Sequence, residues 1–150
     1  IARGLPPVPP EGTPPKGRPG FAPGGLSFIM VASDKLKQTG YRLGVISNRD
    51  HPFTEVLEKL GLSQYFEFSL AGGEIGSYKP EPGIFQAALE KMDAAAQETV
   101  YVGDNYFADV VGSRRAGLTP VLYDPRGLFP EAGCPTITSF DQLVSIVQTL

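Results

Sequence analysis

From about residue 30 to the C-terminus, short apolar runs alternate with longer runs that have helical periodicity. A buried strand needs an apolar run and a crossover helix needs one apolar face, so this alternation indicates βα units and a mostly parallel sheet. The pattern predicts an α/β fold in which helices cover both faces of a doubly wound, three-layer sheet. The expected strands are residues 42–46, 66–70, 99–102 and 120–123, and the expected helices are residues 30–39, 52–60, 84–92, 107–116 and 140–150.

Side chains that can accept backbone N–H groups precede two of these helices. We expect Asp50 to cap the helix at 52–60 and Ser139 to cap the last helix. The first strand, at 42–46, is expected to be buried, so that Ile46→Ala destabilises the protein by about 2–5 kcal/mol.

The start of the chain has a different composition. Eight of the 15 prolines fall within the first 23 residues, with several glycines among them. Proline removes backbone donors and glycine raises the entropy cost of ordering, so this stretch favours neither a helix nor a central strand. We therefore expect residues 1–25 to form a disordered or extended arm and residues 26–150 to form the core domain.

Composition excludes several classes of function. The 150 residues carry a formal net charge of -3, which argues against a primary role in binding nucleic acid. Cys134 is the only cysteine and His51 the only histidine, so neither an intrachain disulfide nor a multi-histidine metal site can form. No apolar run approaches the roughly 20 residues that span a bilayer. With no signal peptide recognised, we expect a cytoplasmic protein, or a piece of one.

Polar residues follow the expected strands where a parallel α/β sheet places its ligands. Ser47 and Asn48 follow the first strand, Asp104 follows the third, and Asp109 comes five residues later. Lys79 lies in a loop just before a helix. Such a set suits phosphate chemistry: the hydroxyl can bind phosphoryl oxygens, the ammonium can neutralise developing charge, and two carboxylates can bind Mg²⁺.

Three segments of the chain resemble motifs of the haloacid dehalogenase (HAD) superfamily of hydrolases. Residues 45–48 (VISN) resemble its second motif, residues 79–85 (KPEPGIF) its lysine loop, and residues 102–109 (VGDNYFAD) its fourth motif. The resemblance covers residues 31–150 and implies a HAD-like Rossmannoid fold. The acidic fourth motif is similar to that of the metal-dependent phosphatases.

The resemblance also implies roles for individual residues. Ser47, Asn48 and Lys79 would be the catalytic residues, with Ser47 and Lys79 binding the transferring phosphoryl group. Asp104 and Asp109 would hold Mg²⁺ or its waters. The substrate would be a small phosphorylated metabolite, hydrolysed through an aspartyl-phosphate, with neither nucleic acid nor membrane as a partner.

The family's first motif, Asp-x-Asp-x-Thr/Val, is not found in the sequence. Asp34 is the only aspartate before Ser47, and we interpret it as a solvated residue of the helix at 30–39. In this family the first-motif strand lies between the strands that end at Ser47 and Asp104. Without it, the arm fills the gap, a partner chain fills it, or the two strands close up; unpaired edges also make self-association plausible.

Two functions remain open at this stage. The first is a Mg²⁺-dependent phosphate monoester hydrolase, and we hypothesise that the gene product is truncated or misread and has lost its nucleophile and cap. The alternative is a non-catalytic pseudo-phosphatase that serves as a binding or structural module. Because a loop lysine has little to bury, we expect Lys79→Ala to abolish any activity at little cost in stability.

Overall fold

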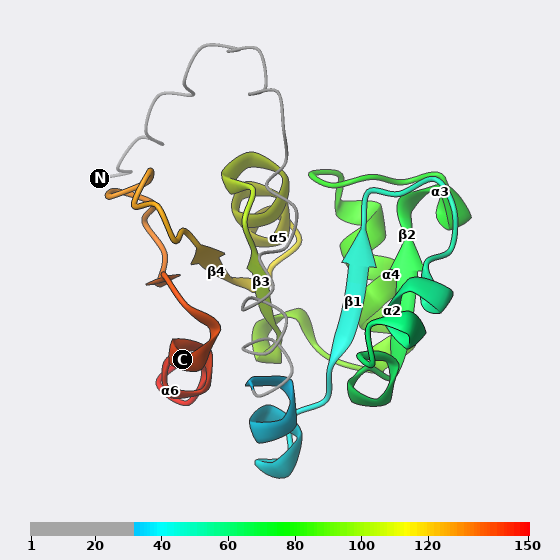
Figure 1. Ribbon diagram of the computed structural model, residues 1–150. Coiled ribbons are helices and arrows are strands. Elements are labelled where there is room, and N and C mark those ends of the chain that lie inside the picture. Colours follow the sequence, from blue (N-terminus) through cyan, green and yellow to red (C-terminus); the bar gives the residue numbers. More distant parts are fainter. Residues whose placement is uncertain (1–31) are drawn as a thin grey trace.

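The computed structural model describes residues 32–150 (Figure 1). The expected arm at residues 1–25 lies outside the described residues, as do the first residues of the expected core domain and of the helix at 30–39. Within the described part, every helix is too short or too polar to cross a membrane.

Five short strands form the centre of the fold, and every recorded pairing between them is parallel. They divide into two sheets with the orders β1–β2 and β3–β4–β5. The predicted parallel α/β architecture is confirmed, and each of the four expected strands is present within two residues of its expected limits. The strands are β1 (Gly44–Ser47), β2 (Phe68–Ala71), β3 (Val100–Gly103), β4 (Thr119–Tyr123) and the unpredicted β5 (Thr136–Ile137).

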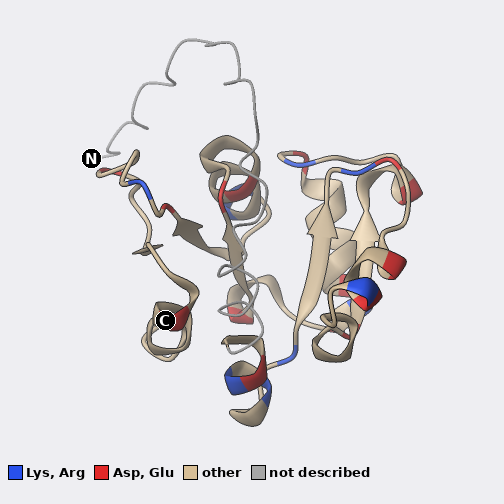
Figure 2. Ribbon diagram, in the orientation of Figure 1, with Lys and Arg blue, Asp and Glu red and all other residues tan. Residues whose placement is uncertain are grey.

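The helices also follow the expected order, with local differences. Residues 32–38 are helical and are followed by α2 (Thr54–Lys59), α3 (Gly72–Ile75), α4 (Pro82–Met92), α5 (Gly112–Arg115) and α6 (Leu143–Val147). Short 3-10 turns occupy η1 (Ser63–Tyr65), η2 (Ala96–Glu98) and η4 (Phe140–Gln142), and η3 (Tyr106–Val111) is a π-helix. Figure 2 shows that charged residues lie on helices and loops, while the strands carry none.

One of the two expected caps is wrong. The N-cap of α2 is Phe53, which makes no side-chain capping bond, and Asp50 instead accepts a hydrogen bond from the Tyr78 hydroxyl (2.9 Å). Ser139 does occupy the N-cap of η4, which leads into α6, and its backbone N–H donates to Gln142 Oε1 (3.3 Å). The aspartate is therefore used to join the loop after β1 to the lysine loop.

Helix α4 holds the two sheets together. Its fully buried residues Ile84 and Phe85 pack with Leu70 of β2 and with Leu118, which precedes β4. The helix at residues 32–38 covers the β3–β4–β5 sheet, where Leu36 packs with Val121 and Ile137. Burial of these apolar side chains is the main stabilising term available to a domain of this size.

An apolar cavity lies between β1 and β3, and we call it the inter-sheet slot. It has a volume of about 90 Å³ and is lined by Gly44 and Ile46 of β1, Val100 and Tyr101 of β3, and residues of α4 that include Phe85. Among the described residues, β1 pairs with β2 and β3 pairs with β4, so these two strands do not close up on each other. The expectation that β1 is fully buried is wrong: Gly44 is exposed and the other three residues are half-buried, because β1 borders the slot.

Candidate active site

The lysine loop is fixed to the end of β1 by the Asn48 side chain. Asn48 Nδ2 donates to the Lys79 carbonyl oxygen (2.8 Å), and the Lys79 N–H donates to Asn48 Oδ1 (2.7 Å). This pair of bonds satisfies both backbone groups of Lys79, and the Lys79–Pro80 peptide bond that follows is cis. In the structure the Asn48 side chain therefore positions the backbone of Lys79.

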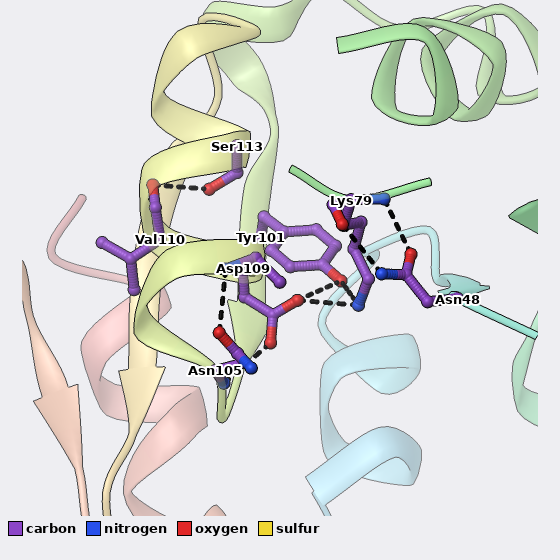
Figure 3. Close-up of polar contacts among 8 residues, drawn as sticks. Asn48, Lys79, Tyr101, Asn105, Asp109, Val110 and Ser113 are labelled. Carbon is purple, nitrogen blue, oxygen red and sulfur yellow. Dashed lines mark hydrogen bonds and ion pairs between the residues drawn. The ribbon is translucent and has the colours of Figure 1, made fainter. Parts of the chain in front are cut away.

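The Lys79 ammonium reaches across to β3 and to the π-helix that follows it (Figure 3). Its Nζ donates to Asp109 Oδ1 (2.7 Å) and to the Tyr101 hydroxyl (2.9 Å). The side chains of Lys79 and Asp109 are 13% and 4% exposed. Lys79 is therefore part of a largely buried ion pair, and the expectation that its removal costs little stability no longer holds.

Asp109 is placed by the turn that follows β3. Its Oδ2 accepts the Asn105 N–H (2.9 Å), while the Asn105 side chain accepts the N–H of Ala108 (2.9 Å) and caps η3. The π-helical turn of η3 carries Asp109 into the interior, and such turns are frequent at functional sites. The expected helix at 107–116 is thus a π-helix joined to the short α5.

Gly103 allows close packing at the end of β3. It is the last residue of that strand and has no left-handed backbone conformation. A Cβ on Gly103 would collide with Cγ and Oδ2 of Asp109. The glycine is therefore required because the Asp109 carboxylate lies directly against its Cα.

Tyr101 is a member of this cluster that the sequence analysis missed. It was counted only as a strand residue, although it lies two positions before Gly103 and so shares its face of β3. Its hydroxyl donates to Asp109 Oδ1 (3.2 Å) and accepts from Lys79. Burial raises the pKa of the Tyr101 hydroxyl well above its usual value, with smaller contributions in the same direction from Asp109 and Asp104.

Ser47 and Asp104 adjoin this cluster in the chain, but their side chains make no hydrogen bond to it. Ser47 is the last residue of β1 and precedes Asn48, and Asp104 directly follows β3 and is exposed. The structure therefore brings Asn48, Lys79 and Asp109 into direct contact and places Ser47 and Asp104 at the ends of the same two strands. The roles expected of these five residues remain predictions.

The whole cluster lies in a part of the chain that matches a known family. Residues 29–122, more than half of the chain, match the family model described as Haloacid dehalogenase-like hydrolase. The chain belongs to the haloacid dehalogenase-like hydrolases. This confirms the resemblance that rested on the three motifs.

Individual relatives are similar over much of the described region. The chain is 39% identical over 103 residues to Haloacid dehalogenase-like hydrolase domain-containing protein 3 from Homo sapiens, covering 66% of this chain and 41% of that protein. It is 38% identical over 88 residues to a glyceraldehyde 3-phosphate phosphatase from Methanothermobacter thermautotrophicus, covering 58% of this chain and 39% of the relative. The chain thus spans about two-fifths of the length of these curated relatives.

A solved member of the HAD family has the same arrangement of elements. The crystal structure of a 2-haloacid dehalogenase from Pseudomonas syringae pv. Tomato DC3000 superposes with a TM-score of 0.73 at 29% identity. The superposition covers 81% of this chain and 52% of the dehalogenase.

The site offers the type of ligand atom, carboxylate oxygen, that binds the Mg²⁺ used by HAD phosphatases. Mg²⁺ takes oxygen ligands and often binds one or two carboxylates together with waters and substrate phosphate. Asp104 and Asp109 supply carboxylates, but both oxygens of Asp109 already accept hydrogen bonds. Within residues 32–150, no three acidic, histidine or cysteine side chains gather closely enough to hold a metal ion.

Proposed function

We propose that this chain is the phosphate-binding part of a HAD-type hydrolase that cleaves phosphate monoesters with Mg²⁺. The observation that carries the proposal is the fixed position of Lys79. Its backbone is hydrogen-bonded to Asn48, and its ammonium is hydrogen-bonded to Asp109 and Tyr101. An ammonium fixed at the carboxyl edge of parallel strands is suited to neutralising charge on a bound phosphoryl group. A relative named as a phosphatase of a small sugar phosphate supports a phosphorylated metabolite as substrate.

Each residue has a task in this proposal. Lys79 donates to a phosphoryl oxygen, and the Ser47 hydroxyl donates to another from the end of β1. Asp104 and Asp109 are the side chains that would hold Mg²⁺, which supplies charge neutralisation at the substrate phosphate. Asn48 holds the lysine loop at the end of β1, the strand whose last residue is Ser47.

The nucleophile is the open part of this function. The reaction through an aspartyl-phosphate requires a carboxylate that attacks phosphorus while the alcohol leaves, and then water that releases phosphate. None of the described residues is assigned that role. We propose that, where the protein is active, such a carboxylate reaches the site from outside residues 32–150.

We also propose that the protein is cytoplasmic.

A second function, a non-catalytic binding module, is favoured by a specific observation. Asp109 is fully engaged with Lys79, Tyr101 and Asn105, so that the charged groups neutralise one another without a ligand. A site of this kind can bind a phosphorylated compound without hydrolysing it. The two functions share phosphate binding and differ in turnover.

One assay separates the two functions. The full chain is tested for Mg²⁺-dependent hydrolysis of an aryl phosphate, beside Asp104→Asn and the control Asp93→Asn, which changes an exposed carboxylate at the end of α4. Turnover that is lost in Asp104→Asn and kept in Asp93→Asn supports the hydrolase. Phosphate binding without turnover in the wild type supports the binding module, and a chain that neither binds phosphate nor turns over substrate contradicts both.

A further inference from the structure

Tyr101 connects the polar cluster to the apolar core. Its ring packs edge-on against Phe85 of α4, with ring centroids 5.1 Å apart and an interplanar angle of 81°. Its hydroxyl points to Lys79 and Asp109 (Figure 3). The packing of β3 against α4 therefore fixes the ring, and the hydroxyl attached to the ring has a fixed position as a result.

The fixed hydroxyl engages one of the N–H donors of Lys79. A lysine ammonium has three N–H donors on a flexible stem. Two of them are directed to Asp109 Oδ1 and to the Tyr101 oxygen. The tyrosine hydroxyl can both accept from Lys79 and donate to Asp109, so the three groups form a closed triangle that leaves one N–H of Lys79 for a ligand.

The triangle also determines the direction of that remaining donor. A single bond to Asp109 would leave the ammonium free to turn about the Lys79 side-chain torsions, because one contact does not fix a rotor. The second contact, to an oxygen held rigidly by the strand, removes this freedom. A donor placed in advance costs no reorganisation when charge arrives.

We propose that the Tyr101 hydroxyl is a positioning group that aims the Lys79 ammonium at a bound phosphoryl oxygen. This inference rests on the proposed function, because it takes phosphate as the ligand of Lys79. Tyr101 acts through Lys79 and does not itself contact the phosphoryl group. The substitution Tyr101→Phe tests it, since it removes the oxygen and keeps the ring against Phe85.

The experiment has two measurements on the full chain. The first is the dissociation constant of inorganic phosphate by calorimetry, for the wild type, Tyr101→Phe and the control Tyr123→Phe. Tyr123 is half-buried and packs on Phe140 at 4.7 Å, so the control removes a tyrosine hydroxyl outside the site. The second is the ¹⁵N signal of the Lys79 ammonium by NMR, assigned by its loss in Lys79→Arg.

We expect Tyr101→Phe to weaken phosphate binding by about 3- to 10-fold, because the freed Lys79 side chain must then be immobilised when phosphate binds. The Lys79 ammonium signal should broaden or exchange faster in Tyr101→Phe and should be unchanged in Tyr123→Phe. A merely structural role for Tyr101 would lower the melting temperature without moving this signal.

Two results would overturn the inference. One is an unchanged ammonium signal together with an unchanged phosphate constant in Tyr101→Phe. The other is equal weakening of phosphate binding by both phenylalanine variants. A wild type that binds no phosphate, but whose ammonium signal depends on Tyr101, would contradict the proposed function. Only the contact between Tyr101 and Lys79 would then be supported. Failure of the proposed function and failure of the positioning role are therefore distinguishable.

Discussion

The Asp109 carboxylate lies directly against the Cα of Gly103, at the point where β3 ends. The residues are joined by a loop in which the Asn105 N–H binds the same carboxylate. Gly103 and Asp109, two residues of the fourth motif, are therefore linked by direct contact as well as by their spacing in the chain.

This contact predicts the effect of Gly103→Ala. The added methyl group would occupy the space of Asp109 Cγ, and overpacking of this kind costs about 1–3 kcal/mol. Denaturant unfolding measures the cost, and Asp109→Gly provides the matched background, because it removes Cβ as well as the carboxylate. In that background the methyl group meets no side-chain atom of residue 109, so Gly103→Ala should cost much less; equal costs in both backgrounds would contradict the contact.

The buried ion pair predicts that Lys79→Ala is destabilising. Removing one partner leaves the Asp109 charge without compensation at a site where its side chain is 4% exposed, and breaking such pairs costs about 3–5 kcal/mol. The control is Lys91→Ala, an exposed lysine in the last turn of α4, which should change the free energy of unfolding by less than about 0.5 kcal/mol. Similar values for the two variants would show that Lys79 and Asp109 are not paired in solution.

The inter-sheet slot predicts that Ile46 contributes less to stability than Leu70. Ile46 is half-buried and borders the slot, whereas Leu70 of the paired strand β2 is 2% exposed. Leu70→Ala should cost about 2–5 kcal/mol, and Ile46→Ala should fall below this range. Equal costs in parallel chemical denaturation would mean that the slot is filled when the full chain is in solution.

The raised pKa of Tyr101 predicts a loss of stability at alkaline pH. The folded protein holds the phenolic proton more tightly than the unfolded chain, so this stabilisation is complete below the unfolded pKa of about 10. It is lost as the pH rises from there through the folded pKa. The free energy of unfolding should therefore fall more between about pH 9 and pH 11 in the wild type than in Tyr101→Phe, and parallel curves would contradict the prediction.

The order of the strands and helices was predictable because each has a strong local pattern. The apolar runs and the amphipathic faces lie within single segments, so periodicity is sufficient to find them. The short β5 was missed because Thr136 and Ile137 carry no pattern of their own and pair only through β4. The cap at Asp50 was wrong because the carboxylate binds Tyr78, a residue distant in the sequence.

The candidate site was partly predictable for the same reason. Asn48 and Asp109 were found from their places after strands and Lys79 from its place in a loop before a helix, and the structure brings the three into contact. Tyr101 was not found, because its contribution depends on which face of β3 meets the lysine loop. The burial of Lys79 was also missed. The sequence around a loop lysine does not indicate that a carboxylate from another element, here Asp109, pairs with it in the interior.

The bonds between Asn48, Lys79 and Asp109 run from the end of β1 to the π-helix after β3. These bonds link the β1–β2 sheet to the β3–β4–β5 sheet, and no strand of one sheet pairs with a strand of the other among the described residues. An anion that binds both Lys79 and residues at the end of β3 would strengthen the link between the two sheets. Because such a ligand binds only the folded state, it would raise the free energy of unfolding. The midpoint of thermal unfolding is then a direct gauge of ligand affinity for this chain, whether or not the ligand is ever turned over.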